Sequence, residues 1–364
     1  MLSERMKKLK PYVPGEQPKD RSFLKLNTNE NPYPPSPRIK DFLEEFDPAE
    51  LRLYSDPSAF GLREAIAARY GTRTEEVFVS NGSDEALSFC FYALFDSQRG
   101  PLLFPEFTYS FYPVYCDFYQ IAYELVPLRE DFRVDMEGFL RAGPACGLIF
   151  ANPNAPTGIG ISLEEVRGLM ERFPSDRSVV IDEAYVDFGG SSAISLLGEF
   201  PNLVIVRTFS KGMSLAGLRL GFVIAREPVI RALSTVKDSF NSYPTDMLSQ
   251  KIGRIAVSDS GYYEQVTLRI METRERFSRR ARGLGWTVLP SQANFVFASH
   301  PDLQGSEVYR LLKERGILVR HFELKGIERF VRISIGRPED MDRLLEEMAG
   351  LSELNSSGRC PPAG

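Results

Sequence analysis

RTFSKGMSLAGLRLGF, residues 207–222, is the stretch of the sequence that decides the fold. It follows an apolar run, Leu203 to Val206, that is typical of a core strand. Lys211 stands just beyond the end of that run, and Arg219 follows eight residues later inside an otherwise apolar segment. Placing an unpaired charge beside a buried strand costs free energy of folding. The stretch therefore predicts a functional site at the end of a strand, where the positive charges of Lys211 and Arg219 have a role.

Short apolar runs alternate with helical patterns from about residue 77 to residue 225. Val, Ile and Leu follow one another in these runs without polar alternation, which is typical of strands buried on both faces. We therefore predict an α/β fold with a mostly parallel central sheet flanked by helices. The runs are VFVS (77–80), LLF (102–104), IAYELV (121–126), GLIFA (147–151), SVVID (178–182), LVIVR (203–207) and GFVIA (221–225).

The pattern changes after about residue 240. A helical stretch, roughly 245 to 283, ends in the arginine-rich METRERFSRRARG and predicts a solvated connecting helix. The segments TVLPSQANFVFA, GILVRHF and FVRISI, with a helix near 338–349, predict a smaller α+β domain. The tail NSSGRCPPAG is too polar and too rich in Pro and Gly to pack, so we expect disorder there.

Composition excludes several classes of protein. The net charge of -5 offers no general attraction for nucleic acid or an anionic membrane. The basic start MLSERMKKLK has no apolar segment after it, and no apolar run approaches the ~20 residues of a membrane span. Four cysteines without zinc-like spacing and two histidines argue against a metal site. We expect a cytoplasmic protein with reduced thiols.

Four polar clusters follow predicted strands: NGSDE (81–85), NPNAPTG (152–158), DEAY (182–185) and SK (210–211). In an open α/β sheet, ligands bind outside the carboxyl ends of the strands. Gly82, Ser83 and Asp84 stand where a helix begins and could hold a phosphate, although a plain helix cap also explains them. Asp182 and Lys211 could form a structural salt bridge instead of a site.

The combination of these clusters fits one ligand, pyridoxal phosphate. Its chemistry needs a lysine for the Schiff base, a carboxylate at the pyridine nitrogen, and an arginine with backbone N–H groups for the phosphate. Lys211, Asp182 and Arg219 supply these groups at or near the ends of predicted strands.

The order of the motifs resembles that of the fold-type-I, pyridoxal-phosphate-dependent aminotransferases, and the variant is similar to the histidinol-phosphate aminotransferases. The resemblance covers about residues 23 to 346, nearly the whole chain. It rests on seven segments in register: LNTNENPYPPSP, LYSDPSAFGLREAIAARYG, NGSDEAL, NPNAPTG, DEAYVDF, RTFSKGMSLAGLRLGF and FVRISIG.

The resemblance implies a role for individual residues. Lys211 corresponds to the Schiff-base lysine, Asp182 to the partner of the pyridine nitrogen, and Tyr185 to the donor at the ring hydroxyl O3′. Tyr109 corresponds to the aromatic residue stacked on the ring, with Phe107 as the alternative. The phosphate cup corresponds to Gly82, Ser83, Asp84, Ser210 and Arg219, with Tyr54 contributed by the other subunit of a homodimer.

The resemblance also implies substrate-binding residues. Arg332 and Arg320 correspond to arginines that bind the anionic end of the substrate, as guanidinium groups do well. Asn31 and Tyr33, on the N-terminal arm, correspond to residues that close over the site. We expect His321 to be a surface or packing residue. We expect most aromatic residues of the 107–119 segment to belong to the core: Phe111, Tyr112, Tyr115, Phe118 and Tyr119.

One position departs from the family. The family loop usually carries an asparagine that donates to O3′, where this chain has Ala155. Asn154 stands one place earlier and is the candidate replacement among the cofactor-binding residues.

The family's organisation implies five parts: an N-terminal arm with part of the small domain (1–45), a large cofactor-binding domain (46–240), a connecting helix (241–285), a small C-terminal domain (286–350) and a disordered tail (351–364). The implied reaction converts L-histidinol phosphate and 2-oxoglutarate to imidazole acetol phosphate and L-glutamate in histidine biosynthesis. Alternatives are an enzyme similar to threonine-phosphate decarboxylase, or a broad aromatic amino acid aminotransferase.

Overall fold

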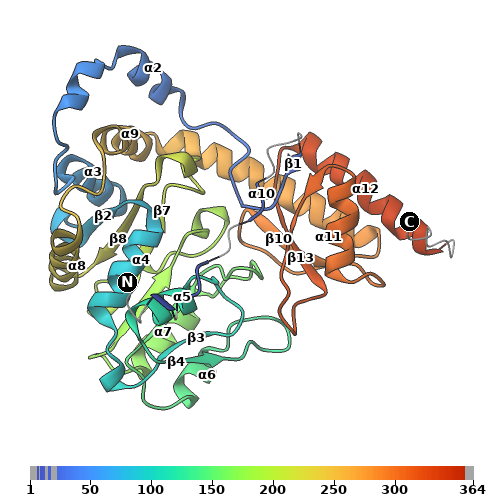
Figure 1. The fold of residues 1–364 in the computed structure, drawn as a ribbon, viewed down its shortest axis with the longest axis horizontal. Helices are drawn as coiled ribbons and strands as arrows, with labels where there is room; N and C mark the ends of the chain where they lie inside the picture. Colours follow the sequence, from blue (N-terminus) through green and yellow to red (C-terminus); the bar gives the residue numbers. More distant parts are fainter. Residues whose placement is uncertain (1–5, 8, 13–14, 18–22, 357–364) are drawn as a thin grey trace.

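The computed structural model describes residues 6–7, 9–12, 15–17 and 23–356 of the chain. Its elements form two parts, built on a large and a small sheet, and a long helix, α10 (Ser260–Gly283), runs between them (Figure 1). Among the described residues, no helix combines the length and the hydropathy that crossing a bilayer requires.

The large sheet has seven strands in the order β2-β8-β7-β6-β5-β3-β4. Its strands pair in parallel except β8, which runs antiparallel to both of its neighbours. The prediction of a mostly parallel α/β sheet is therefore confirmed. The strands are β2 (Val77–Ser80), β3 (Leu102–Pro105), β4 (Tyr123–Val126), β5 (Gly147–Ala151), β6 (Ser178–Asp182), β7 (Leu203–Thr208) and β8 (Gly221–Ala225).

Helices cover both faces of this sheet, because successive side chains of a strand point to opposite faces. Val180 and Val204 pack with α4, α5 and α8, whereas Ile181 and Ile205 pack with α6 and α7. A third core cluster joins α3 and α9 to β2 and β8. The helices are α2 (Pro37–Glu45), α3 (Phe60–Tyr70), α4 (Gly82–Leu94), α5 (Tyr112–Tyr119), α6 (Met136–Arg141), α7 (Leu163–Arg172), α8 (Glu227–Phe240) and α9 (Met247–Ser258).

The small part is built on a four-stranded sheet in the order β12-β13-β10-β9, with α10, α11 and α12 packed against it. The N-terminal arm joins it, because β1 pairs in parallel with β11. The elements are β1 (Leu24–Lys25), β9 (Thr287–Val288), β10 (Phe295–Ser299), β11 (Ile317–Leu318), β12 (Arg320–His321), β13 (Phe330–Ser334), α11 (Gly305–Glu314) and α12 (Pro338–Ser356).

The structure differs from the sequence interpretation in the region after residue 240. The single helical stretch is two helices, α9 and α10, separated at Asp259. The arginine-rich end of α10 is not wholly solvated, since Arg274 is buried and donates to Phe188 O and Ala293 O. A buried guanidinium needs such acceptors. Helix α12 continues to Ser356, and residues 357–364 lie outside the described residues.

Two smaller expectations concern cysteines and aromatic residues. Cys90, Cys116 and Cys146 are buried free thiols, whereas Cys360 lies outside the described residues. The packing role expected for Phe118 is wrong, because 57% of its surface is exposed.

Candidate active site

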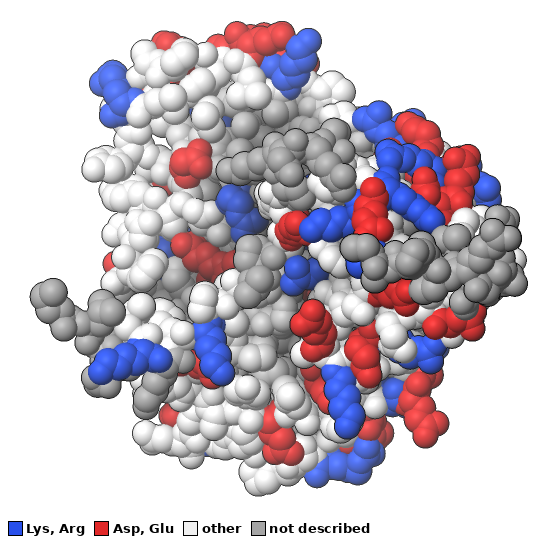
Figure 2. Space-filling model, turned by 45° about the vertical axis from the view of Figure 1, so that its right-hand side comes forward, with Lys and Arg blue, Asp and Glu red and all other residues white. Residues whose placement is uncertain are grey.

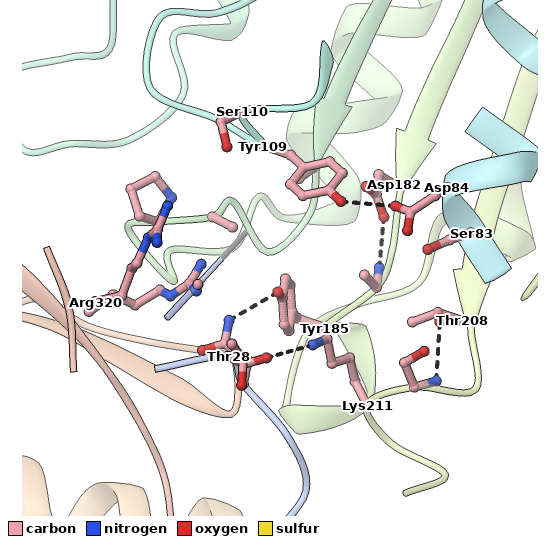
Figure 3. A pocket seen from close by; sticks show the side chains of 18 of the residues that line it. Thr28, Ser83, Asp84, Tyr109, Ser110, Asp182, Tyr185, Thr208, Lys211 and Arg320 are labelled. Carbon is pink, nitrogen blue, oxygen red and sulfur yellow. Dashed lines mark hydrogen bonds between the residues drawn. The ribbon is translucent and has the colours of Figure 1, made fainter. Parts of the chain in front are cut away.

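A pocket lies at the carboxyl ends of β5, β6 and β7, between the large sheet and the small one (Figure 3). It is closed on one side by the N-terminal arm and on another by β12 and β13. Ten of the fifteen site residues predicted from the sequence line it. They are Ser83, Asp84, Tyr109, Asp182, Tyr185, Ser210, Lys211, Arg219, Arg320 and Arg332.

Lys211 lies in the turn after β7, with its side chain pointing toward Tyr185 and the arm (Figure 3). Its Nζ donates to Thr28 O at 3.1 Å and lies 5.7 Å from the centre of the Tyr185 ring. No salt bridge joins Lys211 to Asp182, although the structure describes both residues. The amine is therefore held at the pocket by a neutral acceptor, and the salt-bridge alternative does not hold.

Asp182 ends β6 and is buried at the back of the pocket. Ala184 N donates to its Oδ1 and the Tyr112 hydroxyl donates to its Oδ2, each at 3.1 Å. Burial raises the pKa of Asp182 to about 6, against the opposing effects of the two donors and Lys211. A carboxylate in such surroundings favours a cationic partner, because a positive charge within reach stabilises its ionised form.

The start of α4 and the turn after β7 form a cradle of donors. The Ser210 hydroxyl is buried and has no hydrogen-bond partner among the described residues, while Ser210 N donates to Thr208 Oγ1. Gly82 has a φ of 77°, and a Cβ there would lie 2.7 Å from the Arg219 guanidinium. Only glycine lets α4 begin so close to that cation. The N-terminus of a helix attracts anions.

Asp84 accepts a hydrogen bond from each of two residues that line the pocket. Arg219 Nη2 donates to Asp84 Oδ2 at 2.8 Å, and the Tyr109 hydroxyl donates to Asp84 Oδ1 at 2.9 Å. Asp84 therefore orients Tyr109 and Arg219 around the pocket. Phe107, the alternative to Tyr109, does not line the pocket.

Tyr185 is held from the arm. Asn29 Nδ2 donates to the Tyr185 hydroxyl at 3.0 Å, and Asn29 Oδ1 accepts from Ser334 Oγ at 2.9 Å. The Tyr185 ring packs edge-on against Phe295, with 5.0 Å between ring centres. Since the Tyr185 hydroxyl accepts from Asn29, its own hydrogen is left to donate into the pocket.

Two arginines face the pocket from the small sheet, where Arg320 and Arg332 are directly paired across β12 and β13. Arg332 is half-buried, and its partial removal from water lowers the pKa of its guanidinium. Its Nη2 donates to Asn27 O at 3.2 Å, but its Nε has no partner among the described residues. The guanidinium of Arg332 lies 5.3 Å from the Phe295 ring centre and 5.6 Å from that of Phe322. Two neighbouring cations of this kind favour an anionic ligand.

Three predicted residues lie away from the pocket. Asn31 Nδ2 donates to the backbone oxygen of Lys211 at 3.0 Å, and Tyr33 lies between Arg269 and Arg337. Asn31 and Tyr33 therefore do not line the pocket, and Asn27, Thr28 and Asn29 are the arm residues that do. Tyr54 is 83% exposed and stacks on Tyr243, with ring centres 4.7 Å apart.

Asn154 is fully engaged by its own loop. Its Nδ2 donates to Phe107 O at 2.8 Å and to Thr157 Oγ1 at 3.3 Å, and its Oδ1 accepts from Thr108 Oγ1 at 2.9 Å. Ala155 lines the pocket instead, and Asn154 does not. The structure therefore gives Asn154 no free donor to replace the missing asparagine. Gly82, at the start of α4, does not line the pocket either.

Several pocket residues escaped the sequence interpretation. Thr208 and Asn29 belong to quoted motifs but carry polar side chains common in turns, so nothing marked them individually. Ser110 follows the predicted Tyr109 and Phe322 ends the quoted segment GILVRHF, but neither was singled out, and Tyr12 belongs to no quoted motif. The asparagine-rich segment LNTNENP marked the arm as a whole, but alternation could not select its pocket residues, because Asn29 has a φ of 56° and interrupts an extended chain.

Comparisons with known proteins agree with this geometry. The family model for aminotransferase class I and II matches residues 21–348. A histidinol-phosphate aminotransferase of Syntrophus aciditrophicus is 56% identical over 96% of this chain and 98% of its own. Another, of Chromohalobacter salexigens, is 50% identical over 95% of this chain and 97% of its own.

Solved structures share the fold. The histidinol-phosphate aminotransferase of Sinorhizobium meliloti, in complex with pyridoxal-5′-phosphate, superposes with a TM-score of 0.86 at 24% identity, over 97% of each chain. A decarboxylase of Sulfurospirillum multivorans gives 0.77 at 24% identity, over 91% of this chain and 95% of its own. At such identities the likeness shows the fold alone, but the family model spans nearly the whole chain. This chain belongs to the aminotransferase class I and II family.

Proposed function

We propose that this protein transfers the amino group of L-histidinol phosphate to 2-oxoglutarate with pyridoxal phosphate as cofactor. The products are imidazole acetol phosphate and L-glutamate, and the reaction is a step of histidine biosynthesis. The names of relatives that are 47–56% identical over most of the chain support this reaction. The observation that carries it is Lys211 at a strand end, in one pocket with buried Asp182 and two arginines.

The pocket fits the cofactor at both of its ends. Ser210, whose buried hydroxyl lacks a partner among the described residues, would hold the phosphate together with Ser83 and Arg219. The buried Asp182 carboxylate would face the ring nitrogen, and Tyr109 would cover the ring. Because Ala155 cannot donate a hydrogen bond, Tyr185 is the side chain that we assign to the ring hydroxyl O3′.

When bound, pyridoxal phosphate supplies an electron sink for the pair left at the substrate Cα after its proton is removed. Lys211 provides the amine that attaches the cofactor and then carries a proton at Nζ to and from Cα. Asp182 keeps a proton on the ring nitrogen by its negative charge, which makes the ring a better acceptor. Thr28 O, the acceptor of Lys211, orients the amine within the pocket.

The paired arginines suit both substrates, because each substrate is anionic. L-Histidinol phosphate carries a phosphate where an amino acid has its carboxylate, and 2-oxoglutarate carries two carboxylates. Arg320 and Arg332 are the cations on the small-sheet side of the pocket. We propose that both substrates use this site in turn, in a ping-pong reaction.

We propose a homodimer in which Tyr54 of each subunit reaches the cofactor phosphate of the other. The support is an exposed aromatic pair, Tyr54 and Tyr243, outside the subunit's own pocket. Other large apolar side chains are exposed in the large part of the chain, and a second subunit could cover them. They include Leu51, Leu53, Phe60, Tyr92, Phe118 and Phe240.

Charge is mixed on the face of the molecule that Figure 2 shows. On the face shown in Figure 2, blue and red residues of the described chain are interspersed, without an extended area of either sign. This fits a protein whose ligands are small anions bound in a pocket, and we propose a cytoplasmic location. We also propose that residues 46–240 and 286–350 act as cofactor-binding and substrate-binding domains.

One half-reaction tests the proposal. Purified protein with pyridoxal phosphate and L-histidinol phosphate, but no 2-oxoglutarate, should release imidazole acetol phosphate once per site and then stop. Addition of 2-oxoglutarate should restart turnover and yield glutamate. L-Histidinol phosphate has no carboxylate to lose, whereas release of CO2 from threonine phosphate would support the decarboxylase alternative and contradict the proposal.

A further inference from the structure

Tyr112 has a contact that a packing residue does not need. It begins α5, its side chain is completely buried, and its hydroxyl donates to Asp182 Oδ2 at 3.1 Å. The other oxygen of Asp182 accepts from Ala184 N. Among the described residues, these two donors are the hydrogen-bond partners of the carboxylate, so Tyr112 is its one side-chain donor.

The charges around Asp182 do not by themselves keep it ionised. Burial and the carboxylate of Asp84, from α4, both oppose its negative charge, whereas Lys211, from the turn after β7, favours it. Tyr115, also from α5, is near enough to interact with Asp182 but donates to Asp84 O at 2.7 Å. The hydrogen bonds from Ala184 N and from the Tyr112 hydroxyl both lower the pKa of Asp182, and the Tyr112 bond is the one that a side-chain substitution can remove.

Tyr112 is well suited to remain a donor. Burial and the neighbouring Asp182 raise the pKa of its phenol well above the ordinary value, so the hydroxyl keeps its hydrogen. Its ring is fixed by Phe91 and Phe104, whose centres lie 6.2 and 5.9 Å away. The direction of the O–H group toward Asp182 is thus set by the core.

We propose that Tyr112 is a positioning residue that holds Asp182 ionised and turned toward the pocket. The inference rests on the proposed function, in which Asp182 faces the ring nitrogen of the cofactor. Without the phenol, the buried carboxylate loses a partner and binds a proton more readily. A protonated Asp182 would no longer supply the negative charge that keeps the ring nitrogen of a bound cofactor protonated, and the ring would be a poorer electron acceptor.

The test compares Tyr112→Phe with Tyr115→Phe in the holoenzyme. Both variants remove one buried phenolic oxygen from α5, but only the first removes a donor to Asp182. The readout is the 15N chemical shift of the ring nitrogen in bound, 15N-labelled pyridoxal phosphate. We expect a protonated shift in the wild type and Tyr115→Phe, and a move toward the unprotonated value in Tyr112→Phe.

The steady-state kinetics should distinguish Tyr112→Phe from Tyr115→Phe in the same way. In Tyr112→Phe, kcat should fall about tenfold or more while KM for L-histidinol phosphate changes little, because the paired arginines are untouched. A kcat and 15N shift equal to those of Tyr115→Phe would overturn the inference. An unprotonated ring nitrogen in the wild type would instead contradict the role of Asp182, and with it the proposed function.

A second substitution keeps the test valid if Tyr112→Phe does not fold. Placing 3-fluorotyrosine at position 112 retains the hydroxyl and makes it a stronger donor. The 15N shift should then move toward fuller protonation, the opposite direction to that in Tyr112→Phe. A shift that stays at the wild-type value across the pH range in which the ring nitrogen titrates would contradict the proposed role of Tyr112.

Discussion

Arg219 Nη2 lies 2.8 Å from Asp84 Oδ2, so the cation assigned to the cofactor phosphate is already paired with a carboxylate. Arg219 has a φ of 52°, a conformation that residues other than glycine rarely adopt and that costs of order 1–3 kcal/mol. The pair orients a strained arginine toward the pocket. Because both side chains are partly exposed, the pair itself contributes little to stability.

Replacing Arg219 should therefore weaken cofactor binding more than folding. A hydrogen bond to a charged group is worth about 1.5–3 kcal/mol, so Arg219→Gln should raise the Kd of pyridoxal phosphate roughly 10- to 150-fold. Titration of apoprotein by fluorescence measures it. Arg231→Gln, which removes an exposed arginine of α8 outside the pocket, is the control. Equal affinities in the two variants would exclude Arg219 from the phosphate site.

The paired arginines should control substrate use. Arg320→Gln or Arg332→Gln should lower kcat/KM for L-histidinol phosphate roughly 10- to 150-fold while the cofactor still binds. Arg329→Gln serves as the control, because Arg329 belongs to the same part of the chain but does not line the pocket. Unchanged steady-state kinetics in Arg320→Gln would show that Arg320 does not contact the substrate.

A buried charge cluster around Glu183, the residue after Asp182, predicts a pH effect on stability. Burial raises the pKa of Glu183 to about 7, although Arg207, Ser192 and Ala193 N stabilise its ionised form. Since the pKa is higher in the folded state, folding binds a proton between about pH 4.5 and 7, and stability falls as the pH rises through that window.

Glu183→Gln should remove this dependence. The free energy of unfolding of the wild type should fall relative to that of Glu183→Gln by up to about 3 kcal/mol between pH 5 and 8. Urea unfolding of the apoproteins at several pH values measures the difference. Parallel curves for the two proteins would mean that Glu183 does not titrate in this range.

The proposed dimer predicts complementation between defective subunits. Tyr54→Ala and Lys211→Ala should each be nearly inactive alone. Hybrid dimers of the two place the intact Tyr54 beside the intact Lys211 at one site, so mixing after partial unfolding should restore activity. No recovery, in hybrids verified by mass, would contradict a Tyr54 contributed by the partner subunit.

The sequence predicted those parts of the site that follow from the pattern of neighbouring residues along the chain. Apolar runs without alternation indicated the parallel strands, and polar residues at their ends, such as Asp182 and Lys211, indicated where the pocket lies. The contacts between distant segments could not be predicted in this way. Thr28 O meets Lys211, and Tyr112 meets Asp182, only because the arm and α5 fold back over the sheet.

The sequence also could not determine which residue within a motif faces the pocket. Asn29 and Asn31 stand two positions apart in the same polar segment, and either could be assigned to the pocket from sequence. The structure turns Asn29 toward Tyr185, whereas Asn31 bonds to the backbone of Lys211. Likewise, Asn154 donates to Phe107 O within its own loop, a bond that depends on the fold of that loop and not on its composition.

The central claim is that Lys211 attaches the cofactor, and reduction with borohydride tests it most directly. Protein loaded with pyridoxal phosphate, reduced, digested and analysed by mass spectrometry should carry the pyridoxyl group on the peptide that contains Lys211. Lys211→Ala, treated in the same way, should carry none. A label on Lys237 or Lys251, or on no lysine at all, would contradict the account.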